Sequence, residues 1–170
     1  MSFPTLLTFI PKIQKLAEAS FQFIPFTLQK QVLEKALCEL FAEAIEDEDL
    51  DFLIDQNIAI RIDHTALHWQ LGFDGMRFIV EKPSGKADAC ISGELSEFIL
   101  LASRKEDPDT LFFQRRLCIE GSTELSLAVK NLLDTLDLSQ LPTPMRFALD
   151  HMGNLQQALV KHPKAHKVTA

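Results

Sequence analysis

The chain has 170 residues and a mass of 19.2 kDa, enough for one domain with a hydrophobic core but short for two. Apolar residues make up 46% of the sequence and charged residues 24%, which excludes a disordered or low-complexity polymer. Seventeen basic residues stand against 24 acidic ones, and this net charge of -7 has the wrong sign for binding nucleic acid.

Cysteine usage and hydropathy narrow the class of protein further. Cys38, Cys90 and Cys118 are widely spaced, with no CxxC pair and no histidine at ligand spacing. We therefore expect three free thiols in a reducing, cytoplasmic compartment and no zinc site. No apolar run approaches the roughly 18 residues that a membrane-spanning helix needs, and no secretion signal is recognisable.

The first 26 residues form an apolar segment interrupted by prolines, as in Phe9-Ile10-Pro11 and Phe23-Ile24-Pro25-Phe26. Such a segment is too hydrophobic to remain in water. It is expected to pack on the domain, to pair with another subunit, or to lie in a membrane interface.

Helical periodicity follows and then gives way to strands. Leu33, Leu37 and Leu40 share one face of a helix predicted from Thr27 to about Glu46. Period-two alternation then predicts half-buried strands, and the Asp-Gly pair at 74–75 predicts a hairpin turn. The five predicted strands run over 58–62, 67–73 and 76–82, through 89–91, and through 117–119.

Two further helices are predicted between and after the last strands. The segment 94–104 is apolar nearly all round, so its helix needs cover on two sides. The segment 122–136 has a regular apolar stripe that indicates a core helix. The pattern as a whole indicates an α+β fold, in which helices cover one side of a mostly antiparallel sheet.

No motif for catalysis is present. Glycine never forms GxGxxG or GxxxxGK[ST], and neither GxSxG nor HExxH occurs. His64 and His68 are four residues apart, but they flank a predicted strand rather than lie on a helix. We therefore expect a protein that is not an enzyme and that has no catalytic residue, metal or cofactor.

Three stretches carry a family resemblance: ISGELSEF at 91–98, RKEDPDTLFFQRRL at 104–117 and IEG at 119–121. They resemble the sterol-carrier-protein-like (SCP-2 type) lipid-binding domain, in particular its bacterial branch of ubiquinone biosynthesis accessory factors. The resemblance covers residues 25 to 137. It implies a five-stranded sheet whose helices enclose an apolar cavity. We expect a domain division into an apolar N-terminal segment at 1–26, the lipid-binding domain at 27–137 and a C-terminal extension at 138–170.

The same resemblance implies a carrier in oxygen-independent ubiquinone biosynthesis. Its ligands would be prenylated quinone intermediates or phospholipid, and its partners a pair of iron-sulfur hydroxylases to which it presents the ligand. Peripheral membrane contact would be compatible with this role. The alternative is a scaffold that holds the biosynthetic enzymes together without carrying a ligand.

We expect the cavity wall to be formed by residues of the helices that face the sheet and of the segment that leads into the last strand. An ordinary packed core is the alternative explanation for each of these residues. Leu100 and Leu101, on the far face of their helix, are expected to form a gate or a membrane contact. The wall residues are Leu95, Phe98, Ile99, Phe112, Phe113, Leu125 and Val129.

Overall fold

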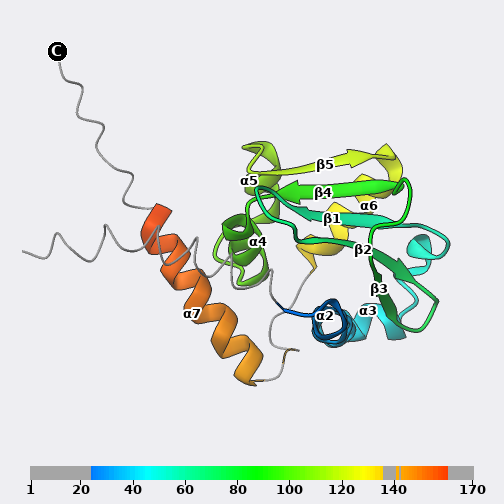
Figure 1. Cartoon of the computed structure of the whole chain (residues 1–170), viewed down its shortest axis with the longest axis horizontal. Coiled ribbons are helices and arrows are strands. Elements are labelled where there is room, and N and C mark those ends of the chain that lie inside the picture. Colours follow the sequence, from blue (N-terminus) through cyan, green and yellow to red (C-terminus); the bar gives the residue numbers. More distant parts are fainter. Residues whose placement is uncertain (1–23, 136–140, 142, 161–170) are drawn as a thin grey trace, which may run out of the picture.

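A computed structural model of the chain describes residues 24–135, 141 and 143–160 (Figure 1). Most of the apolar segment 1–26 therefore lies outside the described residues. The elements in chain order are α2 (Phe26–Leu40), α3 (Ala42–Glu46), a 3-10 turn (Asp51–Leu53), β1 (Ile58–Ile62), β2 (His68–Phe73), β3 (Phe78–Glu81), β4 (Ala89–Gly93), α4 (Leu95–Ala102), α5 (Pro108–Phe113), β5 (Leu117–Gly121), α6 (Thr123–Asp134) and α7 (Thr143–Val160).

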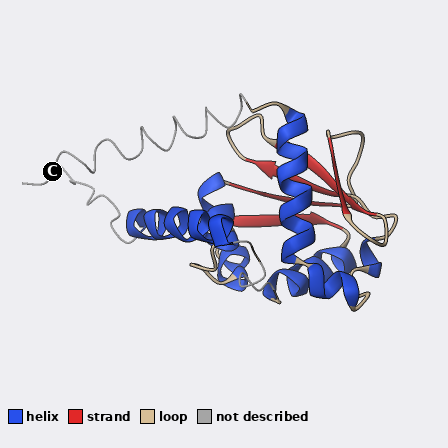
Figure 2. Cartoon of the chain, turned by 90° about the horizontal axis from the view of Figure 1, so that it is seen from below, coloured by secondary structure: helices blue, strands red, loops and turns tan. Residues whose placement is uncertain are grey.

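The five strands form one sheet in the order β3-β2-β1-β4-β5. Only β1 and β4 pair in parallel, while the other three neighbouring pairs are antiparallel. The prediction of a mostly antiparallel five-stranded sheet in an α+β fold is thus confirmed. Seen from below, α2 runs across the strands (Figure 2).

Alternation along the strands determines which face of the sheet is buried. Ile58 and Ile62 of β1 are 6% and 2% exposed, whereas Arg61 between them is exposed. Successive strand residues point to opposite faces, so the isoleucines of β1 share the covered face. On that face the core extends to Val80 of β3 and Leu50 before the 3-10 turn, both fully buried.

Helix α4 is covered on more than one side, as its all-round apolar sequence predicts. Leu100 and Leu101 are 1% and 6% exposed, and Leu101 packs with Leu111 and Leu117. Both α5 and α7 contact α4, and α4 lies between α7 and the sheet (Figure 1). The expected gate or membrane contact at Leu100 and Leu101 is therefore corrected, because protein covers both side chains.

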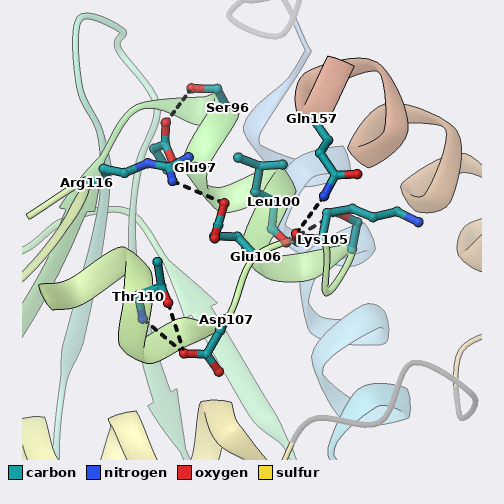
Figure 3. A network of polar contacts seen from close by, with 10 residues as sticks. Ser96, Glu97, Leu100, Lys105, Glu106, Asp107, Thr110, Arg116 and Gln157 are labelled. Carbon is teal, nitrogen blue, oxygen red and sulfur yellow. Dashed lines mark hydrogen bonds and ion pairs between the residues drawn. The ribbon is translucent and has the colours of Figure 1, made fainter. Parts of the chain in front are cut away.

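A polar network joins α4 and the loop after it to Arg116, the residue directly before β5 (Figure 3). The Arg116 guanidinium forms ion pairs with Glu97 of α4, at 2.7 Å, and with Glu106 of the loop, at 3.2 Å. The N–H of Thr110 donates to Asp107 at 3.0 Å, which caps the start of α5. These contacts hold α4 in place beside the sheet.

Candidate ligand cavity

A cavity of about 450 Å³ lies between α2, α4 and the covered face of β1 and β2. This volume falls in the range of roughly 300–1,000 Å³ that is typical of small-molecule sites. The residues that line it are apolar with one exception, Gln29. They are Ile24, Leu28, Gln29, Val32, Leu33, Leu37, Ile60, Ile62, Leu67, Trp69, Leu71, Leu95, Phe98, Ile99, Ala102 and Leu149.

The polar atoms in this wall bind one another. The indole N–H of Trp69 donates to Oε1 of Gln29 at 2.8 Å. The Gln29 amide in turn donates from Nε2 to the backbone carbonyl of Ile24 at 2.7 Å. A ligand group that took one of these partners would leave a buried polar atom unsatisfied, at a cost of about 1–3 kcal/mol. The wall therefore suits a hydrocarbon and disfavours a polar head group.

Helix α2 is held over the sheet by a clamp on the edge strand β3. The Lys30 ammonium donates to the carbonyl of Val80 at 2.8 Å, and the N–H of Val80 donates to Glu34 at 2.9 Å. Lys30 and Glu34 also form an ion pair at 2.9 Å. Burial of Glu34 acts to raise its pKa, but the hydrogen bond from Val80 and the nearby Lys30 outweigh burial and lower the pKa below 4.5.

This clamp makes the stability of the fold depend on pH. The lowered pKa of Glu34 means that its contribution is complete above about pH 4.5 and is lost as the pH falls through the folded-state pKa. Glu34→Gln is expected to lower the free energy of unfolding by about 1 kcal/mol at neutral pH. The difference from the wild type should shrink on acidification, as measured by urea unfolding at several pH values.

The control for this prediction is Glu46→Gln, which makes the same exchange at an exposed position at the end of α3. That variant should match the wild type at every pH. A loss for Glu34→Gln that stayed constant down to pH 3 would contradict the charge argument.

The rim of the cavity is partly open to solvent. Leu28 and Val32 on α2 line the cavity and are each 50% exposed, while α7 contributes Leu149 to the wall. Within the described ranges, no helix combines the length and the apolar character needed to cross a membrane. Exposed apolar residues at the rim are consistent with a route for an apolar ligand between solvent and cavity.

The expected wall residues divide into two groups. Leu95, Phe98 and Ile99 line the cavity, but the other four lie elsewhere. Phe112 is half-buried in the core and, with Phe113, lines a separate hollow beside Lys130; Phe113 is 92% exposed.

For these four residues the expectation is corrected, because of where their helices lie. Leu125 and Val129 of α6 are buried in the packed core and do not contribute to the cavity surface. Helix α5 ends at Phe113, so this side chain lies at the exposed end of the helix rather than under it.

Much of the wall comes from residues that were not predicted as site residues. The strand residues Ile60 and Trp69 lie on the covered face of the sheet. The alternation of apolar residues along their strands could have identified them as wall residues. No local sequence pattern could have identified Gln29, because its hydrogen-bond partner Trp69 is 40 residues away in the sequence.

Comparison with known proteins agrees with this architecture. Residues 34–134 match the model of the SCP-2 sterol transfer family. The chain is 39% identical over 146 residues to the "Ubiquinone biosynthesis accessory factor UbiT" of Escherichia coli K12, covering 86% of this chain and 83% of that protein.

Two of the solved structures that match this chain are matched over most of their own length. "UbiJ-SCP2 Ubiquinone synthesis protein" superposes with a TM-score of 0.54 at 18% identity, over 65% of this chain and 93% of that one. The sterol carrier protein domain 2 of Helicoverpa armigera superposes with a TM-score of 0.47 at 17% identity, over 61% and 86% of the two chains. The chain therefore belongs to the SCP-2 sterol transfer family, and within that family it is a relative of the ubiquinone biosynthesis accessory factor UbiT.

Proposed function

We propose that this protein is a non-catalytic lipid carrier in ubiquinone biosynthesis. The observation that carries the proposal is the cavity of about 450 Å³, whose lining is apolar apart from Gln29 and whose Gln29 and Trp69 side chains bind each other. The 39% identity to a relative named as a ubiquinone biosynthesis accessory factor supports the pathway.

The chemistry of the wall favours a particular way of holding the ligand. Burial of a prenyl or acyl chain gains about 0.8 kcal/mol for each CH₂ removed from water. A quinone ring or a phosphate has polar atoms that this wall does not satisfy, so it gains nothing by entering. The tail therefore lies inside and the head group stays at the rim, near Leu28 and Val32.

A head group at the rim is accessible to an enzyme while its tail stays bound. We propose that the ligand is a prenylated quinone intermediate or a phospholipid. The carrier would present it to the paired iron-sulfur hydroxylases of the oxygen-independent route, in the cytoplasm. The support for these partners is the family resemblance of the stretches at 91–98 and 104–121.

The test uses Trp69, the single tryptophan of the chain, as an internal reporter. Its indole ring lines the cavity, so a bound prenyl quinone analogue should change its fluorescence. Organic extracts of the purified protein should also contain a prenyl quinone intermediate or a phospholipid by mass spectrometry.

Ala102→Phe should abolish most of this binding. Ala102 lines the cavity from the last turn of α4, and a phenyl ring there would occupy space that the ligand needs. We expect binding at least about tenfold weaker by Trp69 fluorescence titration. The matched control is Ala66→Phe, which places the same ring at an exposed turn position and should bind like the wild type.

Two results would overturn the carrier proposal. The first is the absence of extractable lipid together with failure to bind an added prenyl quinone or phospholipid. The second is unchanged binding by a correctly folded Ala102→Phe variant, because the ligand would then occupy another place.

A scaffold role is the second candidate, and exposed apolar side chains away from the cavity favour it. Phe113 of α5 is 92% exposed and Leu127 of α6 is 58% exposed. Exposed apolar residues of this size are frequent at protein contacts. Phe113→Ser with Leu127→Ser should then weaken association with the purified hydroxylase pair and leave the lipid content unchanged. Loss of lipid with unchanged association would reject the scaffold.

A further inference from the structure

Helix α7 departs from the pattern of an ordinary surface helix at three positions. Such a helix turns apolar residues toward the protein and polar residues toward water. In α7, Gln156 is 8% exposed and faces the protein. Phe147 and Leu155 are 65% and 54% exposed, so apolar side chains face solvent.

The outward residues form a continuous stripe. Phe147, His151 and Leu155 are spaced by four residues and therefore share one face over two turns, about 12 Å of helix. The rings of Phe147 and His151 are in edge contact, with centroids 4.1 Å apart. Ala148 and Ala158 are also exposed. We call Phe147, His151 and Leu155 the outer stripe of α7.

The opposite face of α7 is already occupied by α4 and the loop after it. Gly153 is buried against Ser103, and the amide of Gln157 donates to the carbonyl of Lys105 at 3.2 Å (Figure 3). Lys105 also pairs with Asp150 at 2.5 Å. The helix is thus docked with its outer stripe turned away from the domain.

The net charge of the sequence from α7 to the last residue differs in sign from that of the residues before it. Residues 143–170 contain four basic residues and one acidic residue, whereas residues 1–142 contain 13 basic and 23 acidic residues. The one acidic residue, Asp150, is paired with Lys105. The helix and the sequence that follows it therefore combine exposed apolar groups with positive charge, which is the combination that binds anionic lipid surfaces.

We propose that the outer stripe of α7 docks on an anionic bilayer surface. This inference deepens the proposed carrier function: Leu149 of the same helix lines the cavity, so docking would bring the cavity close to the lipid from which its ligand comes. Phe147 and Leu155 enter the acyl boundary, and the exposed Arg146 beside Phe147 contacts the phosphates.

The experiment is co-sedimentation of the full chain with vesicles. Vesicles of phosphatidylcholine mixed with phosphatidylglycerol should bind the protein, and vesicles of phosphatidylcholine alone should bind it weakly. Raising the NaCl concentration should weaken binding to the anionic vesicles, because salt screens the basic residues.

The variant Phe147→Ser with Leu155→Ser should bind anionic vesicles at least about tenfold more weakly. The matched control, Phe113→Ser with Leu127→Ser, removes one exposed phenylalanine and one exposed leucine from α5 and α6. It should bind vesicles like the wild type. Circular dichroism and thermal unfolding would verify that both variants fold.

The proposal is overturned if the wild type fails to bind anionic vesicles or binds neutral vesicles equally well. It is also overturned if the Phe147→Ser and Leu155→Ser variant binds like the wild type. A concentration-dependent dimer that this variant loses, without vesicle binding, would instead assign the stripe to a second copy of the chain.

The two proposals can fail independently. Ala102→Phe should lose bound lipid yet still sediment with anionic vesicles. The stripe variant should sediment poorly yet keep the Trp69 fluorescence response to a prenyl quinone analogue added in detergent. Loss of both properties in either variant would contradict the separation of cavity and stripe.

Discussion

Arg116→Ala is expected to lower the free energy of unfolding by about 2–3 kcal/mol. Arg116 and Glu97 have side chains only 21% and 13% exposed, and their facing atoms, Nη2 and Oε2, have no hydrogen-bond partner among the described residues besides this ion pair. Removal of the guanidinium leaves the Glu97 carboxylate buried without its counter-charge, which is the costly change in a buried pair. Urea unfolding at neutral pH measures the loss.

A second substitution distinguishes this cause from a loss of packing. Glu97→Gln in the Arg116→Ala background removes the unpaired buried charge of the Glu97 carboxylate and should recover part of the lost stability. Arg61→Ala is the exposed control, since Arg61 and Asp63 form a pair with side chains 50% and 39% exposed. It should change stability by less than about 0.5 kcal/mol. Equal losses in Arg116→Ala and Arg61→Ala would contradict the argument.

Gly153→Ala is expected to undock α7 from α4, although alanine favours a helix over glycine by about 1 kcal/mol. A Cβ atom at Gly153 would overlap Oγ of Ser103 and lie 2.5 Å from its Cβ, so the helices must move apart. Overpacking of this kind costs about 1–3 kcal/mol. The amides of α7 should exchange hydrogen faster, while α2, α4 and the sheet remain protected.

The rescue of this variant is Ser103→Gly in the same chain. It removes both Ser103 atoms that the new Cβ would meet. The third close atom, Cγ of Lys105 at 2.8 Å, belongs to a flexible side chain that can move aside, so the second substitution should restore the protection of α7. Undocking would also remove Leu149 from the cavity wall, so Gly153→Ala should weaken the binding of a prenyl quinone analogue. Unchanged hydrogen exchange in Gly153→Ala would show that α7 tolerates the contact without moving.

The strands and their covered face follow from the sequence because alternation is a local property. Ile58, Ile60 and Ile62 alternate over five residues, and β1 takes this stretch. The Asp-Gly pair at 74–75 likewise predicts the turn between β2 and β3, where Gly75 takes a positive φ of 91°. Strand order is different: the parallel pairing of β1 with β4 joins segments 31 residues apart, and no local pattern encodes it.

The sequence by itself established that α4 needs cover on two sides, but not what supplies the cover. Leu100 and Leu101 would have the same pattern beside a membrane, a ligand or another helix; the tertiary structure covers them with protein. The cavity wall also depended on tertiary structure, because Gln29 and Trp69 meet only when α2 crosses the sheet. Local periodicity determines which residues leave water, whereas the packing of distant segments determines whether the space between them is filled or empty.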